Sequence, residues 1–180
     1  LFSFGTWFYL IDDATFATLS FIMLGAILAF LIFNWEPSEV FMGDTGALVI
    51  GMLLAILAIH FINVNYSLPL ESPYKFLSSI GTAACFIIIP LVDTSRIIIL
   101  RLLKGKSPFK PDKSHVHHAI MRLGKTHSQT TLILAGVHIF YVVMALLLRD
   151  LTDRYVLLAV VGLAVGLSVT LHPLILKRLV

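Results

Sequence analysis

The sequence is poor in charge and nearly free of cysteine. Only 13% of its 180 residues are charged, whereas soluble domains carry about 25%. Apolar residues make up 58%, against roughly 45–50% in soluble domains. The single cysteine, Cys85, excludes an intrachain disulfide, and its place in an apolar run predicts a structural thiol. These shortages exclude a disulfide-held scaffold and favour a protein that lies in a bilayer.

Long apolar runs are what the sequence has in abundance. A helix needs about 20 apolar residues to cross the hydrocarbon core of a membrane. Five runs approach that length, at residues 15–33, 47–64, 76–92, 130–148 and 155–171. They lack the alternation of β-barrel strands. We therefore predict an all-α fold, a polytopic transmembrane helix bundle with about five spans in a single membrane domain, 1–180.

The basic residues gather in one loop. Seven of the 13 Lys and Arg residues lie between positions 101 and 125. Loops rich in Lys and Arg face the cytoplasm, and counting spans back from this loop puts residues 34–44 on the same side. We expect 34–44 and 101–129 to be cytoplasmic loops. The net charge of +3 then reflects topology and anion binding, and we expect no nucleic-acid partner.

Asp44 stands where an apolar helix is predicted to begin. Gly43 and Gly46 flank it and leave the backbone open to close approach by a ligand. A carboxylate at the mouth of a helix bundle suits Mg²⁺, which one or two carboxylates usually hold together with substrate phosphates. The alternative is that Asp44, or Thr45, merely caps the helix. The local sequence leaves both interpretations open.

Asp93 and Arg96 lie near the end of the third apolar run. They are three residues apart, so on a helix they share a face and can pair. Pro90 precedes them and predicts a kink. An ionisable residue at membrane depth indicates function by default. The pair is equally compatible with a solvated helix end beyond the bilayer.

Three histidines, His115, His117 and His118, follow the proline-stiffened segment 105–113. If Ser114 caps a helix there, His115 and His118 fall on one face. A helix start with cationic side chains predicts a pyrophosphate site. A zinc site and an ordinary solvated loop are the alternatives, although neither a cysteine nor a second histidine cluster stands nearby to complete a zinc site.

Two motifs resemble those of a known family. Residues 41–46 read Phe-Met-Gly-Asp-Thr-Gly, after Asn34 and Pro37, and resemble the Asn…Phe-Met-Gly-Asp-x-Gly-Ser signature of polyprenyl-phosphate N-acetylhexosamine-1-phosphate transferases (glycosyltransferase family 4). Residues 93–118 end in His-Val-His-His and resemble the long cytoplasmic loop and His-x-His-His motif of the same family. The resemblance covers nearly the whole chain.

The nearest branch is the one that starts O-antigen, enterobacterial common antigen or teichoic-acid linkage synthesis. Val116 interrupts the three consecutive histidines usual in the related phospho-MurNAc-pentapeptide translocases. The resemblance implies a Mg²⁺-dependent enzyme of the bacterial inner membrane, with Mn²⁺ as an alternative ion. It implies transfer of a sugar-1-phosphate, most often GlcNAc-1-phosphate, from a UDP-sugar to undecaprenyl phosphate, with release of UMP. It leaves a homodimer open.

The resemblance also implies a role for each candidate site residue. Asp44 would be the metal ligand and a catalytic residue. The histidines that would hold the donor diphosphate are His115, His117 and His118. The residues expected to contact the donor or brace the site are Asn34, Asp93, Arg96 and Arg101.

Some family features are missing from this sequence. Family members have about ten spans of roughly 20 residues each, and their earlier loops carry an Asp-Asp pair and an Asn-x-x-Asp-Gly-x-Asp-Gly segment. We therefore expect this chain to be the C-terminal half of a transferase, with an incomplete site. We interpret Asp12-Asp13 as a solvated turn on the outer face, not as the missing pair. A non-catalytic fragment and an ion-coupled transporter are the alternative functions.

Overall fold

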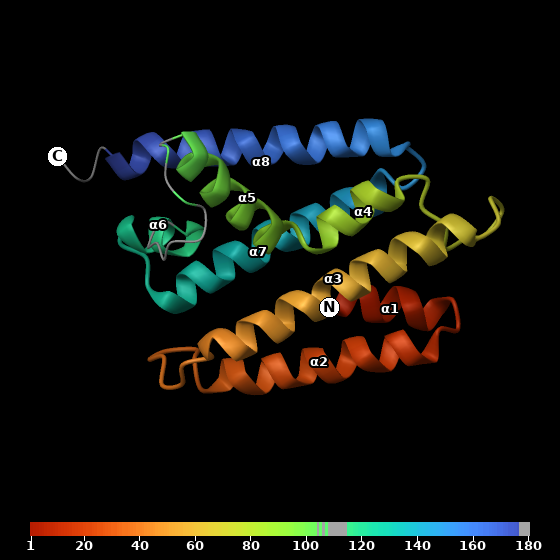
Figure 1. Cartoon of the computed structure of the whole chain (residues 1–180), viewed down its shortest axis with the longest axis horizontal. Helices are drawn as coiled ribbons and strands as arrows, with labels where there is room; N and C mark the ends of the chain where they lie inside the picture. Colours follow the sequence, from red (N-terminus) through yellow and green to blue (C-terminus); the bar gives the residue numbers. More distant parts are fainter. Residues whose placement is uncertain (104, 106, 108–114, 177–180) are drawn as a thin grey trace.

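The computed structural model describes residues 1–103, 105, 107 and 115–176, and leaves out the side chains of residues 100, 103 and 168–176. Regular structure in this part of the chain is all helical, which confirms the predicted fold class. Figure 1 shows the helices lying mostly along one long axis, with α8 and α2 at opposite edges. Their bounds are α1 Phe2–Leu10, α2 Ala14–Ile32, α3 Gly43–Ser67, α4 Ser79–Phe86, α5 Ile88–Leu103, α6 Val116–Arg122, α7 His127–Leu147 and α8 Asp153–Leu176.

An aromatic cluster holds α1 against α3 and α4. Phe4 packs edge-on against Phe86 with ring centroids 5.2 Å apart, and Trp7 packs against Phe61 at 4.4 Å. Such pairs contribute about 0.5–1.5 kcal/mol each beyond the area they bury. Between helices in lipid, close packing of this kind is a main attractive force. Cys85 is fully buried in the same core, which confirms it as a structural thiol.

Three helices are long and apolar enough to cross a membrane: α2, α3 and α7. They contain all but the last residue of the predicted runs 15–33 and 130–148 and the whole of 47–64, and few of their large apolar side chains are buried. In lipid this outward apolar surface is the expected arrangement. The predicted run 155–171 lies within α8, whose side chains are described only as far as Leu167. The described residues therefore contain three candidate spans, or four if a bent pair counts as one, and fit a polytopic helical membrane protein.

The predicted span at residues 76–92 is broken into a bent pair of helices, which agrees with the kink expected from Pro90. Helices α4 and α5 meet at an angle of 87°, with Ile87 outside both helices. A continuous helix would bring the Pro90 ring against the carbonyl of Phe86, four residues earlier. Within the first turn of a new helix proline is tolerated, because its missing N–H would have no partner there. Pro90 thus explains why α5 starts afresh.

The turn between α1 and α2 is better anchored than predicted. Asp13 accepts a hydrogen bond from the backbone N–H of Phe16 at 3.2 Å and caps α2. Its other oxygen lies 2.7 Å from Nε2 of His60 on α3, and the His60 ring stacks on Phe16. The interpretation of Asp12-Asp13 as a merely solvated turn is therefore wrong for Asp13, whose side chain is 22% exposed.

The end of the bundle that carries this turn also holds a polar network. The buried amide of Asn65 donates to the Phe76 carbonyl at 2.8 Å and accepts from the Phe76 N–H at 2.9 Å. The Asp153 carboxylate accepts from the N–H of Gly81 at 2.7 Å. Because buried polar groups are costly unless paired, these bonds fix the loop 68–78 and the start of α4 in one arrangement.

Candidate functional site

The two loops singled out from the sequence lie at the same end of the bundle. Figure 1 shows the α2–α3 connection, α6 and the start of α7 together at one end of the long axis. Glu36 in the first loop accepts a hydrogen bond from the Ser128 hydroxyl and one from Thr126 Oγ1 at 3.4 Å. The two loops, which the sequence predicts on one side of the membrane, are thus in direct contact. Which compartment this end faces stays a prediction.

Asp44 lies in the first turn of α3 and is exposed. The N-cap of α3 is Met42, so neither Asp44 nor Thr45 occupies the cap position that the alternative interpretation required. Gly43 has a φ of 68°, a conformation that side chains disfavour and glycine accepts. The chain thus turns sharply before Asp44, and the negative charge sits at the favourable end of the helix dipole.

Asn34 organises the loop that leads to Asp44. Its Nδ2 donates to the Phe30 carbonyl at 3.1 Å, at the end of α2. Its Oδ1 accepts from the Ser38 hydroxyl at 2.6 Å and from the Val40 N–H at 3.2 Å. Both ends of the amide are thereby bonded to the protein. Of the two roles expected for Asn34, these contacts favour bracing, and a direct donor contact stays a prediction.

The histidine segment forms the short helix α6, one residue later than predicted. His115 is the N-cap residue, and Ser114, the predicted cap, lies outside the described residues. The cap comes instead from α5, because Oδ1 of Asp93 accepts the Val116 N–H at 2.9 Å. Oδ2 of Asp93 lies 2.8 Å from Nδ1 of His115. Of the backbone N–H groups predicted to bind pyrophosphate at this helix start, that of Val116 is therefore already bonded to Asp93.

The three imidazoles form a continuous row. The ring centroids of His115 and His117 are 5.8 Å apart, and those of His117 and His118 are 4.0 Å apart. Partial burial, together with the charges of His118 and His115, lowers the pKa of His117, and Asp93 opposes this shift. A bound anion would act in the same direction as Asp93 and favour the charged ring. The row is thus suited to respond to a phosphate.

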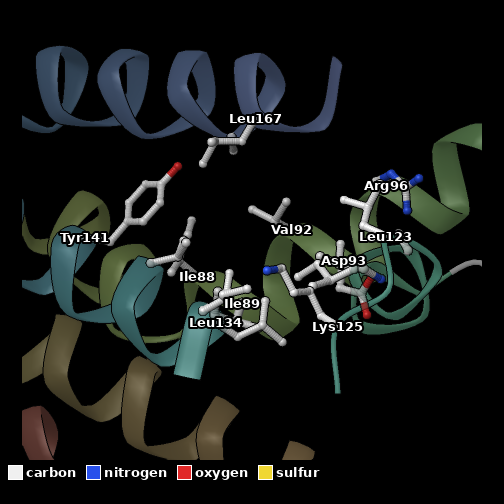
Figure 2. Close-up of a pocket in the computed structure, with 16 residues that line it drawn as sticks. Ile88, Ile89, Val92, Asp93, Arg96, Leu123, Lys125, Leu134, Tyr141 and Leu167 are labelled. Carbon is white, nitrogen blue, oxygen red and sulfur yellow. The ribbon is translucent and has the colours of Figure 1, made fainter. Parts of the chain in front are cut away.

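A cavity of about 280 Å³ lies between α5, α6, α7 and α8. Its walls are mostly apolar side chains such as Ile88 and Leu134. Figure 2 shows Asp93, Arg96 and Lys125 gathered toward one end and Tyr141 toward the other. Tyr141 is 1% exposed. Its hydroxyl has no hydrogen-bond partner among the described residues. The cavity therefore combines a long apolar wall with a polar, partly cationic end.

The predicted site residues fall into two groups at this end of the molecule. One group surrounds α6 and the polar end of the cavity, and the other belongs to the loop before α3. Arg101 lies in the last turn of α5 and is half-buried. Among the described residues, His, Cys, Asp and Glu side chains do not form a group of three or more that could hold a metal ion. The histidines as described therefore lack the side-chain ligands of a zinc site.

Sequence reasoning missed the roles of Glu36, Lys125 and Tyr141. Lys125 entered only the charge count that set the topology, and Glu36 stood beside a motif without belonging to it. Tyr141 lies in an apolar run, where a buried hydroxyl needs a partner. A tyrosine within an apolar run could therefore have been recognised from the sequence as a candidate for lining a site. The contact of Glu36 with Ser128 spans 92 positions and has no local signature.

Comparisons with known proteins agree with the two motifs. Residues 1–62 match glycosyl transferase family 4. A Bacillus subtilis (strain 168) protein named probable undecaprenyl-phosphate N-acetylglucosaminyl 1-phosphate transferase is 31% identical over 137 residues, covering 75% of this chain and 35% of the relative. A decaprenyl-phosphate N-acetylglucosaminephosphotransferase of Mycolicibacterium smegmatis is 28% identical over 165 residues, which cover 88% of this chain and 40% of the relative.

A third relative is the undecaprenyl-phosphate alpha-N-acetylglucosaminyl 1-phosphate transferase of Pasteurella multocida. It is 38% identical over 120 residues, which cover 64% of this chain and 31% of that protein. The chain thus spans 31–40% of the length of these three relatives. No solved structure matches it. The family match, the relatives and the two motifs agree, and the chain belongs to glycosyl transferase family 4.

Proposed function

We propose that this protein transfers N-acetylglucosamine-1-phosphate from UDP-N-acetylglucosamine to a polyprenyl phosphate and releases UMP. The names of the relatives support the sugar phosphate and the lipid acceptor. The UDP-sugar is the donor that the family resemblance implies, and the row of imidazoles is suited to its diphosphate. Undecaprenyl phosphate is the acceptor we expect, and the product would start a cell-envelope polysaccharide.

The observation that carries the proposal is the cavity between α5 and α8. A polyprenyl phosphate has a long apolar chain and an anionic head, so its site must be apolar with a cationic end. The cavity has apolar walls, and Arg96 and Lys125 line it together with Asp93. Asp93 in turn contacts His115. Lipid phosphate and donor diphosphate could therefore meet at the junction of the cavity and α6.

Asp44 fits a magnesium site that the substrate completes. Its carboxylate is exposed and follows the sharp turn at Gly43. Mg²⁺ usually takes one or two protein carboxylates and fills its other positions with water and substrate phosphates. When bound, the ion would neutralise charge on the donor diphosphate. Mn²⁺ accepts the same oxygen ligands and is the alternative ion.

The proposed chemistry is phosphoryl transfer. An oxygen of the lipid phosphate forms a bond to the β-phosphorus of the donor, the bond from that phosphorus to the bridging oxygen breaks, and UMP leaves. Positioning and charge neutralisation dominate such reactions. His115, His117 and His118 would hold the diphosphate oxygens through charge-assisted hydrogen bonds. Arg96 and Lys125 would hold the lipid phosphate, and Arg101 would add positive charge at the end of α5.

The proposal includes a location. UDP-sugars are cytoplasmic, so the end of the bundle that carries α6 should face the cytoplasm of a bacterial inner membrane. Seven Lys and Arg residues between positions 101 and 125 support this orientation, because such residues are enriched on the inner side.

The decisive experiment uses the full-length protein in lipid nanodiscs with undecaprenyl phosphate, Mg²⁺ and radiolabelled UDP-N-acetylglucosamine. We expect equal amounts of UMP and labelled lipid, and no labelled lipid when undecaprenyl phosphate is left out. UDP-glucose and UDP-N-acetylgalactosamine test the choice of sugar. Folded protein that releases no UMP from any of these donors would refute the proposal. Uptake of intact UDP-sugar into proteoliposomes would instead support the transporter.

A further inference from the structure

Asp93 reaches from α5 to the first histidine of the motif. Its Oδ2 lies 2.8 Å from Nδ1 of His115, and its Oδ1 accepts the backbone N–H of Val116 at 2.9 Å. Both oxygens of this carboxylate, which is 19% exposed, are thereby bonded to the start of α6. Asp93 therefore fixes the ring of His115 as well as the backbone beside it.

This contact selects one tautomer of His115. An ionised carboxylate only accepts hydrogen bonds, so the hydrogen between the two groups belongs to Nδ1. The partner of one ring nitrogen determines the state of the other. With Nδ1–H held by Asp93, Nε2 on the opposite side of the ring stays available to another partner. The His115 side chain is 42% exposed, which leaves room for a ligand.

We propose that Asp93 is a positioning residue that presents Nε2 of His115 to a phosphoryl oxygen of the nucleotide-sugar donor. This rests on the proposed function. When Nε2 bonds a phosphate oxygen it carries the second proton, and the ring is then a cation between two anions, Asp93 and the phosphate. Carboxylates that orient histidines in other enzymes act in this way, and their loss acts through the histidine.

The variant Asp93→Asn tests the proposal with little change in shape. The amide oxygen can still accept the Val116 N–H, but the amide NH₂ now donates to Nδ1 of His115. We expect the ring to switch to the Nε2–H tautomer. ¹⁵N NMR of histidine-labelled full-length protein in nanodiscs reads this directly, with the His115 signal identified by its loss in His115→Gln. The matched control Asp150→Asn, at an exposed carboxylate, should leave the tautomer unchanged.

The kinetic test separates action through His115 from a structural role. We expect Asp93→Asn to lower kcat/KM for UDP-N-acetylglucosamine about 10- to 100-fold, as is typical for the loss of a group that orients a ligand. If Asp93 acts through His115, the double variant with His115→Gln is no slower than His115→Gln alone. Multiplied losses, or an Nε2–H tautomer in the wild type, would overturn the proposal.

The two hypotheses can fail separately. If the wild-type protein turns over no UDP-sugar, the proposed function fails, while the NMR signal of His115 still decides the tautomer. If Asp93→Asn does not fold, the wild-type signal alone tests the assignment, and an Nδ1–H ring is the result that supports it.

Discussion

The Ser128 hydroxyl donates a hydrogen bond to the Glu36 carboxylate, across 92 positions of the sequence. Thr126, the N-cap of α7, donates to the same oxygen at 3.4 Å. A carboxylate is favourable at a helix N-terminus because of the helix dipole. Glu36 thereby links the loop that precedes Asp44 to the segment that follows the histidine helix.

Removing this link should loosen the two loops without unfolding the protein. We predict that Glu36→Ala increases amide hydrogen exchange in residues 34–42 and at the start of α7, since it removes two hydrogen bonds worth about 1 kcal/mol each or less at an exposed site. Hydrogen-exchange mass spectrometry checks this. Glu39→Ala removes the same charge from the same loop and should change little. Equal exchange in the two variants would contradict the role of Glu36.

Asp44 should be required for turnover. If its carboxylate holds the metal ion, Asp44→Asn in the full-length protein reduces UMP release by several orders of magnitude, and excess Mg²⁺ does not restore it. Wild-type protein stripped with EDTA should recover with Mg²⁺ or Mn²⁺. Glu39→Gln, a nearby carboxylate change, serves as the control. Turnover near the wild-type rate in Asp44→Asn would show that the metal role is wrong.

His118 should affect the donor more than the lipid. Loss of its imidazole removes one expected hydrogen bond to the diphosphate, worth about 1.5–3 kcal/mol when a charged group is involved. We predict that His118→Ala raises KM for UDP-N-acetylglucosamine or lowers kcat by about tenfold or more, with membrane insertion intact. Steady-state kinetics in both substrates checks this. A change confined to the KM for polyprenyl phosphate would argue against the diphosphate role.

His117 should make stability depend on pH. Its pKa in the folded protein is lowered from 6.5 by burial and by the neighbouring charged histidines, so below pH 6.5 the unfolded chain binds more protons. The free energy of unfolding should therefore fall as the pH drops from 6.5 toward the lowered pKa. Melting temperatures at pH 7.5 and 5.5 measure this. His117→Gln should reduce the difference, and an unchanged difference would assign it to other groups.

Removing the Tyr141 hydroxyl should stabilise the folded protein. Burying an unpartnered polar group costs about 1–3 kcal/mol, and the Tyr141 hydroxyl is such a group among the described residues. We predict that Tyr141→Phe raises the melting temperature of the ligand-free protein. Thermal unfolding in nanodiscs is the measurement. If the variant melts at a lower temperature, the hydroxyl has a partner in the cavity, such as a bound lipid or water.

The sequence was sufficient to predict three long helices and to place the two candidate loops on the same side of the bundle. α2, α3 and α7 follow from runs of apolar residues whose length matches a bilayer. The meeting of the two loops follows from counting spans, because an even number of crossings returns the chain to the same side. Both arguments depend only on local composition, which a single sequence shows directly.

The links between these elements could not be predicted in the same way. The spacing of Asp93 and Arg96 showed only that they can pair on one helix face, and no pattern in the sequence indicates that Asp93 caps α6 and contacts His115. Asp13 likewise finds His60 across 47 positions. Such contacts depend on how helices pack, and packing leaves no periodic pattern in the sequence. The kink at Pro90 was expected, but its angle was not.

Because the chain bends sharply before α5, a small change in the direction of α5 at Ile88 would displace the residues further along the helix. On the other side of the break, hydrogen bonds of Asn65 and Asp153 hold loop 68–78 and α4 in place. Asp93 lies five residues after Ile88, the first residue of α5. Five helical residues rise about 7.5 Å, so a tilt of about 10° would carry Asp93 sideways by roughly 1.3 Å. Displacements of about 1 Å can slow catalysis roughly 100-fold. Substitution of Asn65 or Asp153, at the opposite end of the bundle, should thus reduce turnover before it reduces stability.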